Sequence, residues 1–259
     1  MGELIARAEA LKALMVPGSP VVLPNVWDAA SARDFVAAGF EALATSSGAV
    51  ARTLGYEDGE DMPADEAFGA VGRISRSVEV PVTADVERGY GFSPSQLVER
   101  LIEAGAVGCN LEDSVPGSGE MVESEVQARL LGDVRAAADD AGVPLVVNAR
   151  VDVFLRFGRD QAARDLLTEG LDRARRYLDA GADGVYPIFL LDEAVLADFA
   201  EQVAAPVNAF YLPKGPSLSR LAELGVARIT FGGGLHHATV EVVTAMADRL
   251  ASGQDPYGG

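Results

Sequence analysis

Three carboxylate side chains have the types and spacing expected of a metal site. Asp85 and Glu87 lie two residues apart, directly after the apolar residues at 80–82, and Glu112 follows a second apolar run. Because side-chain direction repeats every second residue of a strand, Asp85 and Glu87 are expected to point to the same side. Carboxylates so close together repel one another unless a cation lies between them. Mg²⁺, with Mn²⁺ as the alternative, prefers such oxygen ligands, whereas an isolated pair of this kind would also suit a solvated turn.

The segments that carry these carboxylates belong to a regular alternation of helices and strands. Helical stretches end in Ala-Gly or a similar pair, where glycine can adopt the left-handed conformation that closes a helix. Each is followed by a run too apolar to have a face in water, which is typical of parallel strands buried on both sides. Strands are predicted at 21–24, 42–45, 80–85, 108–111, 144–149, 184–187, 206–209 and 228–231. Helices are predicted at 3–15, 29–38, 63–77, 124–141, 192–203, 217–224 and 237–251, with one beginning at 94, one ending near 180, and a loop at 46–62.

This alternation predicts the fold class. Strands that alternate strictly with helices form a parallel sheet with right-handed crossovers. Eight such units fit a closed barrel better than an open sheet, and no G-x-G-x-x-G motif follows the first strand. We therefore predict an α/β protein with a single (β/α)₈ TIM-type barrel that spans residues 1–259 as one domain. In such barrels the chemistry lies at the carboxyl ends of the strands.

The strand ends supply further candidate residues at the same mouth as the three carboxylates. Arg150 ends the fifth strand, where it could bind a carboxylate or phosphonate through two hydrogen bonds, or pair with the acidic cluster. The segment Ser46-Ser47-Gly48-Ala49 follows the second strand and offers hydroxyls and backbone N–H groups to an anion, unless it forms only a turn. Asn208 ends the seventh strand and is a candidate substrate-binding residue.

Other potentially reactive residues are expected to be structural. Cys109 lies inside the fourth strand, where a buried thiol is expected to be inert. His236 and His237 follow the eighth strand and are expected at a solvated helix start, while the glycines at 232–234 could bind a phosphate group.

Composition limits the partners and the compartment. The formal net charge of −18 argues against nucleic acid or an anionic membrane as a partner. No apolar run is long enough to cross a bilayer, and the first residues lack the layout of a signal peptide, so we expect a cytoplasmic protein. The single cysteine excludes an internal disulfide. The only lysines, Lys12 and Lys214, are not predicted inside the barrel, which argues against Schiff-base chemistry.

Several motifs together resemble the isocitrate lyase/phosphoenolpyruvate mutase superfamily, well over 23–152 and more loosely beyond. They are Leu23-Pro24-Asn25-Val26-Trp27-Asp28-Ala29, Ser46-Ser47-Gly48, Leu54-Gly55-Tyr56-Glu57-Asp58, Ala84-Asp85-Val86-Glu87-Arg88-Gly89-Tyr90-Gly91, Asn110-Leu111-Glu112-Asp113 and Asn148-Ala149-Arg150-Val151-Asp152. The resemblance implies a (β/α)₈ barrel in a homo-oligomer, a tetramer or a dimer, whose last helix is exchanged between subunits. It also implies Mg²⁺ and a small carboxylate substrate, with C–C or P–C bonds made or broken beside an enolate.

The resemblance also implies roles for individual residues. The metal-site carboxylates are Asp85, Glu87 and Glu112, some of them acting through water. The segment that holds the substrate carboxylate is Ser47, Gly48 and Ala49. The residue near the reacting centre is Asp58, the substrate-binding arginine is Arg150, and the catalytic set is Asp58, Arg150 and Glu112.

One loop departs from the patterns of the superfamily and leaves the reaction open. Residues 114–121 read Ser-Val-Pro-Gly-Ser-Gly-Glu-Met, without the Lys-Cys-Gly-His segment of the lyases or the Lys-Thr-Asn segment of the mutases. We expect a Mg²⁺-dependent carbon–carbon lyase that acts on a small 2-oxo or 2-hydroxy carboxylate through a metal-stabilised enolate, like an oxaloacetate decarboxylase or a methylisocitrate lyase. The alternatives are a P–C bond enzyme, such as a phosphonopyruvate hydrolase or a mutase, and a barrel that binds a carboxylate without turning it over.

Overall fold

The computed structural model describes residues 1–258, which form nine short strands and eleven helices. The strands are β1 (Val21–Val22), β2 (Asn25–Val26), β3 (Leu43–Thr45), β4 (Val82–Asp85), β5 (Gly108–Glu112), β6 (Val146–Arg150), β7 (Gly184–Tyr186), β8 (Asn208–Phe210) and β9 (Arg228–Thr230). The helices are α1 (Gly2–Leu14), α2 (Ala29–Ala37), α3 (Ser47–Leu54), α4 (Ala64–Ser75), α5 (Pro94–Glu103), α6 (Ser124–Asp140), α7 (Val153–Phe157), α8 (Ala163–Asp179), α9 (Glu193–Val203), α10 (Leu218–Glu223) and α11 (Gly234–Ala251).

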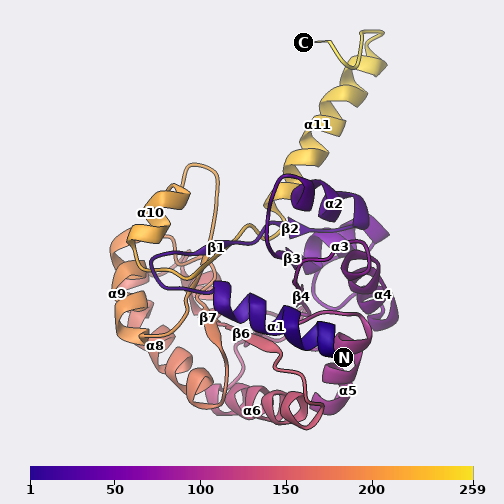
Figure 1. Cartoon of the computed structure of the whole chain (residues 1–259). Helices are drawn as coiled ribbons and strands as arrows, with labels where there is room; N and C mark the ends of the chain where they lie inside the picture. The colour runs from indigo at the N-terminus through magenta and orange to yellow at the C-terminus, as the bar shows by residue number, and fades with distance from the viewer. Residues whose placement is uncertain (259) are drawn as a thin grey trace.

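The strands are parallel and follow one another around an α/β barrel, as predicted, with helices on the outside (Figure 1). One sheet has the order β2-β3-β4-β5-β6-β7 and the other the order β1-β9-β8. A parallel bridge between Val185 and Val207 joins the two sheets on one side. On the other side they share the chain from β1 to β2, where Leu23 donates to Ile229 at 2.9 Å and Pro24 accepts from β3.

Helix α1 covers the amino-terminal end of the barrel. Its buried residues Ala8 and Leu11 belong to a cluster with Leu23 and Ala42, at or near the starts of the neighbouring strands. In Figure 1 this helix crosses the barrel face nearest the viewer. The carboxyl ends of the strands lie at the opposite end, and their loops carry the candidate site.

The structure corrects three of the predicted elements. The segment predicted as a loop at 46–62 contains the helix α3, because Ser46 accepts a hydrogen bond from the backbone of Ala49 at 3.3 Å and caps the helix. Glycine at 55, with φ 89°, then ends it. A short helix, α7, follows β6, and α11 begins at Gly234 instead of His237.

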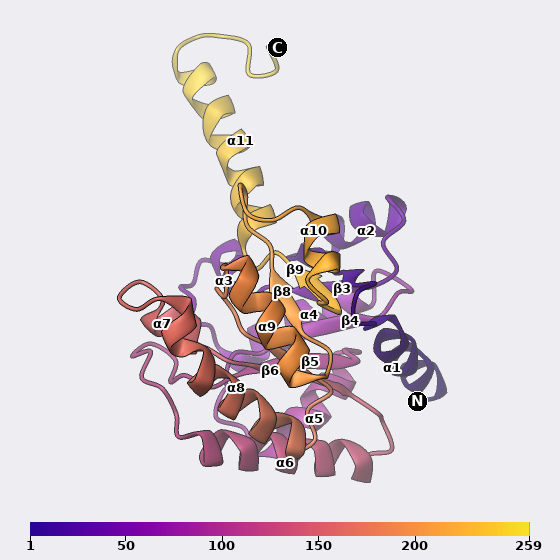
Figure 2. The ribbon, with the colours of Figure 1, turned by 90° about the vertical axis from the view of Figure 1, so that its left-hand side faces the viewer.

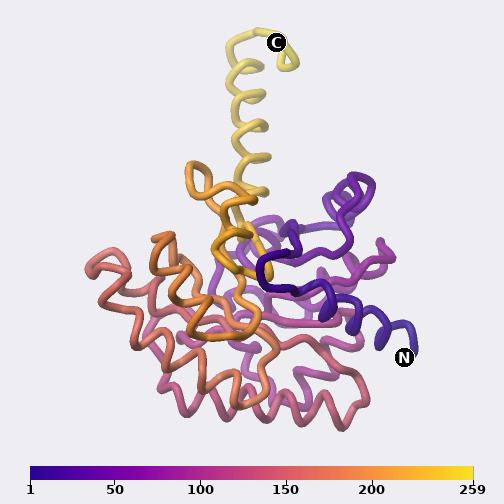
Figure 3. The backbone as a smooth tube through the Cα atoms, turned by 60° about the vertical axis from the view of Figure 1, so that its left-hand side comes forward, coloured from indigo at the N-terminus to yellow at the C-terminus, as the bar shows by residue number. Residues whose placement is uncertain are grey.

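Helix α11 projects from the barrel (Figures 1, 2 and 3), and it carries exposed apolar side chains. None of its residues is buried, and Val242, Val243 and Leu250 are 56, 62 and 60% exposed. Within residues 1–258, no helix combines the length and apolar character needed to span a bilayer.

Candidate active site

The turn after β4 holds the first two carboxylates in different conformations. Asp85 is the last residue of the strand, and its Oδ2 accepts hydrogen bonds from the backbone N–H of Ser47 at 3.3 Å and its hydroxyl at 3.1 Å. Glu87 lies beyond the strand with φ 51°, and its carboxylate accepts from the hydroxyl of Tyr90 at 3.1 Å. Strand alternation, on which the expectation of a common direction rested, therefore does not apply at Glu87, because the strand ends before it.

The side chain of Glu60 holds this turn in place. Glu60 accepts hydrogen bonds from the backbone N–H groups of Arg88 at 3.1 Å and Tyr90 at 2.7 Å. Both Glu60 and Tyr90 have positive φ angles, 60° and 54°, which cost free energy in non-glycine residues. The loop before α4 thus fixes the backbone that positions Glu87.

Arg150 ends β6 and is fully engaged by carboxylates. Its Nη1 pairs with Oε2 of Glu112 at 2.7 Å. Its Nε and Nη2 donate to the two oxygens of Asp152 at 2.6 and 3.1 Å. Asp152 has no exposed surface and also accepts from the hydroxyl of Ser114, so a buried network fixes the orientation of the guanidinium group.

The amino-terminal end of α3 lies beside Asp85 and carries the predicted anion-binding segment. The first N–H groups of a helix lack acceptors within the helix and favour negative charge. Asp58, which is exposed, lies against this end, because a Cβ added at Gly48 would be 3.1 Å from its carboxyl carbon. Ser47, Gly48 and Ala49 therefore meet Asp58 at the barrel mouth.

Two adjoining cavities bring these residues together. A cavity of about 400 Å³ is lined by Ser47, Gly48, Ala49 and Asp85, together with Phe189, Phe210, Gly232 and His236. A second cavity, of about 270 Å³, is lined by Glu87, Glu112, Arg156 and the loop residues Pro116, Gly117 and Gly119. Asp58, Arg150 and Leu155 line both cavities. All predicted site residues except Asn208 therefore lie around one mouth.

Burial dominates the electrostatics of the carboxylates. It raises the pKa of Glu87 to about 8, with smaller contributions from the charges of Asp58 and Asp85. It also raises the pKa of Asp85 and of Glu112, although the guanidinium group of Arg150 opposes both shifts. Burial opposes the charge of Arg150, but Asp152 first, and then Glu112 and Asp85, hold its pKa well above the usual value. The site therefore holds more buried carboxyl groups than one arginine can keep ionised.

The donor set fits a cation that keeps part of its water. Oδ1 of Asp85 is buried and has no hydrogen-bond partner, so it is available as a ligand. Within residues 1–258, no three His, Cys, Asp or Glu side chains are placed to ligate one ion directly. Mg²⁺ usually takes one or two protein carboxylates and several waters. Asp85 would fit such an ion as a direct ligand, and Glu87 and Glu112 would then be expected to contact it through water.

Asn208 and His236 have surroundings different from those expected, whereas Cys109 agrees with its expectation. Asn208 lies inside the barrel, where it donates to Thr230 at 2.9 Å and is absent from the lining of both cavities. His236 was expected in solvent, but it lines the larger cavity and packs against Trp27 with ring centroids 5.0 Å apart. Cys109 is buried, and burial raises its pKa to about 12, as expected of an inert thiol.

Two residues of the site were missed in the sequence. Tyr90 is the hydrogen-bond partner of Glu87, and Arg156 lines the smaller cavity. The available signal for Arg156 is its spacing: it lies four residues after Asp152, which predicts a helical turn with both side chains on one face.

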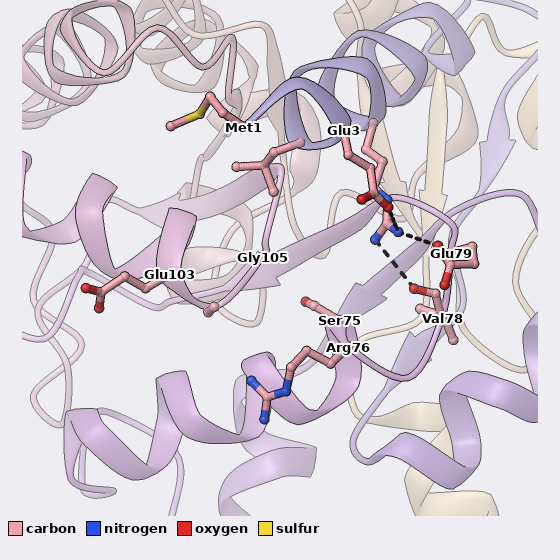
Figure 4. A pocket seen from close by; sticks show the side chains of 11 residues that line it. Met1, Glu3, Ser75, Arg76, Val78, Glu79, Glu103 and Gly105 are labelled. Atoms are coloured by element: carbon pink, nitrogen blue, oxygen red, sulfur yellow. Dashed lines mark hydrogen bonds and ion pairs between the residues drawn. The ribbon is translucent and has the colours of Figure 1, made fainter.

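Another cavity lies away from the strand ends. It has a volume of about 420 Å³ and lies between α1 and the carboxyl ends of α4 and α5 (Figure 4). Arg7 of α1 pairs with Glu3 on the same helix at 2.5 Å and donates to Glu79 at 2.7 Å and the carbonyl of Val78 at 3.4 Å. The contacts with Glu79 and Val78 tie α1 to the barrel. Although this cavity is slightly larger than the one beside Asp85, none of the candidate site residues lines it.

The fold and the site define the class: an α/β barrel with an acidic cluster, an arginine and a helix N-terminus at the carboxyl ends of its strands. The family follows from comparison with known proteins. The chain belongs to the phosphoenolpyruvate phosphomutase family, whose model matches residues 11–251, and so to the isocitrate lyase/phosphoenolpyruvate mutase superfamily. The resemblance found in the sequence motifs is thereby confirmed.

Three relatives show how far the similarity extends. A candidate phosphonomutase from Burkholderia cenocepacia J2315 has a crystal structure that matches with a TM-score of 0.88 and 40% identity, over 93% of this chain and 99% of that chain. An uncharacterized protein of Mycobacterium tuberculosis is 31% identical, over 92% of this chain and 87% of its own. The 2-methylisocitrate lyase of Escherichia coli (strain K12) is 28% identical, over 80% and 70% of the two chains.

Proposed function

We propose that this protein is a Mg²⁺-dependent enzyme that breaks a carbon–carbon bond in a small 2-oxo or 2-hydroxy carboxylate. The observation that carries the proposal is the shared wall of the two cavities, where Asp58 and Arg150 lie between the α3 N-terminus and the buried carboxylates. The E. coli relative named 2-methylisocitrate lyase, which breaks a bond of this kind, supports it.

Different residues of the chain would contact different parts of such a substrate. The N-terminus of α3 would hold the substrate carboxylate through the backbone N–H of Gly48 and the helix dipole, while the N–H of Ala49 donates to the capping Ser46. Arg150, held rigid by Asp152, would keep positive charge beside the reacting carbon atoms. Asp58 is exposed at the same wall and would give or take a proton. When bound beside Asp85, Mg²⁺ would withdraw electron density from the substrate oxygen atoms.

The test is turnover of a panel of acids by purified protein with Mg²⁺. The panel contains oxaloacetate, 2-methylisocitrate and 2,3-dimethylmalate, and the products measured are pyruvate, CO₂ and carbonyl compounds. We expect turnover of at least one acid, its loss in Glu112→Gln, and its retention in the control Glu99→Gln, an exposed residue of α5. No turnover, combined with calorimetric binding of oxalate and Mg²⁺, would contradict the proposal and favour a carboxylate-binding barrel.

A second candidate function is cleavage or rearrangement of a P–C bond. The observation that favours it is the 40% identity with the candidate phosphonomutase over nearly the whole of both chains. Phosphorus NMR of phosphonopyruvate incubated with the protein and Mg²⁺ separates the two functions. A new phosphate or phosphate-ester signal would favour the second function, and an unchanged spectrum would count against it.

We also propose that α11 packs against a second copy of the chain in a homo-oligomer. Val242 and Val243 are more than half exposed on a helix that leaves the barrel, and the hydrophobic effect favours covering such side chains. Light scattering should give a dimer or tetramer for the wild-type protein and a smaller species for Val243→Asp. A monomeric wild-type protein would contradict this assembly.

A further inference from the structure

Helix α7 brings a second arginine to the mouth of the barrel. Arg156 lines the smaller cavity together with Glu87 and Glu112, whereas the α3 N-terminus lines the larger one. Its side chain is 32% exposed, compared with 12% for Arg150. Arg156 is therefore accessible to a ligand in the cavity, while Arg150 is largely covered.

The two arginines also differ in how many of their donors are free. Three nitrogen atoms of Arg150 contact carboxylate oxygens within 3.1 Å. Arg156 donates through Nη2 to the hydroxyl of Ser114 at 2.9 Å, and the same nitrogen lies 4.0 Å from Asp152. An arginine has five N–H donors. Arg156 thus keeps donors for a further anion, whereas Arg150 has its guanidinium group occupied.

The loop after β5 makes room for the Arg156 guanidinium group. A Cβ added at Gly119 would lie 2.5 Å from its Nη1, so any larger residue would displace the arginine. The loop is closed by hydrogen bonds of 2.8 Å from Val115 to Glu120 and from Gly119 to Val115. This loop lacks the reactive segments of the lyases and mutases, and in their place it accommodates Arg156.

We propose that Arg156 binds a second anionic group of the substrate, a carboxylate or a phosphonate, at the end away from the α3 N-terminus. The two cavities meet at Asp58 and Arg150, so one short molecule can reach from the helix terminus to Arg156. Planar guanidinium groups match carboxylate and phosphonate oxygens through paired hydrogen bonds. The substrate class is then a short dianionic acid. This inference rests on the proposed function, because it requires that the substrate occupies these cavities.

The test compares ligands with one and two anionic groups by calorimetry in the presence of Mg²⁺. The ligands are pyruvate, which has one carboxylate, and two dianionic probes, 3,3-difluorooxaloacetate and phosphonopyruvate. For Arg156→Gln we expect the Kd of a dianionic probe to rise about tenfold or more, with the Kd of pyruvate changed less than about twofold. Arg156→Lys keeps the charge and should lose less. The exposed Arg159→Gln removes the same charge nearby and should change neither. The probe with the larger loss shows whether a carboxylate or a phosphonate is held.

The outcomes separate this inference from the proposed function. If the wild-type protein binds these ligands but Arg156→Gln weakens all of them equally, or none, the inference is wrong and the proposed function stands. If the wild-type protein binds no ligand with Mg²⁺, both are wrong. If Arg156→Gln does not fold, Arg156→Lys decides: it must weaken a dianionic probe more than pyruvate, and an equal effect on both overturns the inference.

Discussion

The Glu87→Gln variant should be more stable than the wild-type protein above neutral pH when no metal is present. Glu87 is 3% exposed, and the hydroxyl of Tyr90 donates to its carboxylate. Burial and the charges of Asp58 and Asp85 raise its pKa from 4.5 to about 8. The folded protein therefore favours the neutral carboxyl group, which glutamine imitates in shape and charge.

The size of the effect follows from the pKa shift. Between pH 4.5 and about pH 8 the unfolded chain releases the proton of Glu87 while the folded chain keeps it, so the free energy of unfolding falls as the pH rises. One such group contributes a slope of about 1.4 kcal/mol per pH unit. Over the whole window the loss is at most about 5 kcal/mol, and less where water in the cavity screens the charge. Glu87→Gln should remove this part of the slope.

Mg²⁺ should have the opposite dependence on pH. Ligation requires ionised carboxylates, so protons leave when the metal binds. Because a ligand of the folded state stabilises it, added Mg²⁺ should raise the stability of the wild-type protein more at high pH than at low pH. In Glu87→Gln this gain should be smaller at every pH, since one carboxylate of the site is missing.

Urea unfolding, followed by circular dichroism in EDTA at fixed protein concentration, measures these slopes. The control is Glu99→Gln, which removes the same charge from an exposed position on α5 and should keep the wild-type slope. A wild-type stability that is constant or rises across the window would refute the reasoning. So would a Glu87→Gln variant whose stability falls as steeply as that of the wild-type protein.

Three further predictions concern neighbouring features. Arg150→Ala should lower the free energy of unfolding by about 3–5 kcal/mol, measured by urea unfolding, because it leaves the buried carboxylate of Asp152 without its bidentate partner. Gly48→Ala should displace Asp58 and lower kcat about tenfold. Its Tm should stay nearly constant, because the preference of alanine for the helix, about 1 kcal/mol, offsets the cost of moving Asp58. Cys109 should resist a thiol reagent in the folded protein and react after unfolding, as counted by mass spectrometry.

The barrel was predictable because its signal is repeated. Strands buried on both sides must be apolar throughout, and each helix must end before the next strand begins, so the same pattern recurs along the chain. The first strand was predicted less accurately, at 21–24. Pro24 has no N–H group to donate, and the chain there changes partners, from β9 on one side to β3 on the other. A local pattern does not show such a change of neighbour.

The site was predictable in its residue types but not in its local conformation. Ser46-Ser47-Gly48-Ala49 looks like a loop because small polar residues favour turns, yet the side chain of Ser46 caps a helix there. The position of Glu87 depends on the left-handed backbone of Tyr90, whose N–H donates to Glu60, thirty residues earlier in the chain. Hydrogen bonds between distant loops decide these conformations, and no spacing within one segment shows them.

The loop after β5 bears on which residue at the mouth of the barrel would transfer a proton. Its residues that line the smaller cavity are Pro116, Gly117 and Gly119, none of which has a side chain that can transfer a proton. Of the two polar residues on the shared wall, Arg150 is held by carboxylates and keeps its proton, because its pKa is raised. In the proposed reaction, Asp58 is then the residue on that wall that would exchange a proton with the substrate. In the proposed reaction this loop therefore shapes the binding of the substrate through Arg156, and proton transfer depends on the loop that carries Asp58.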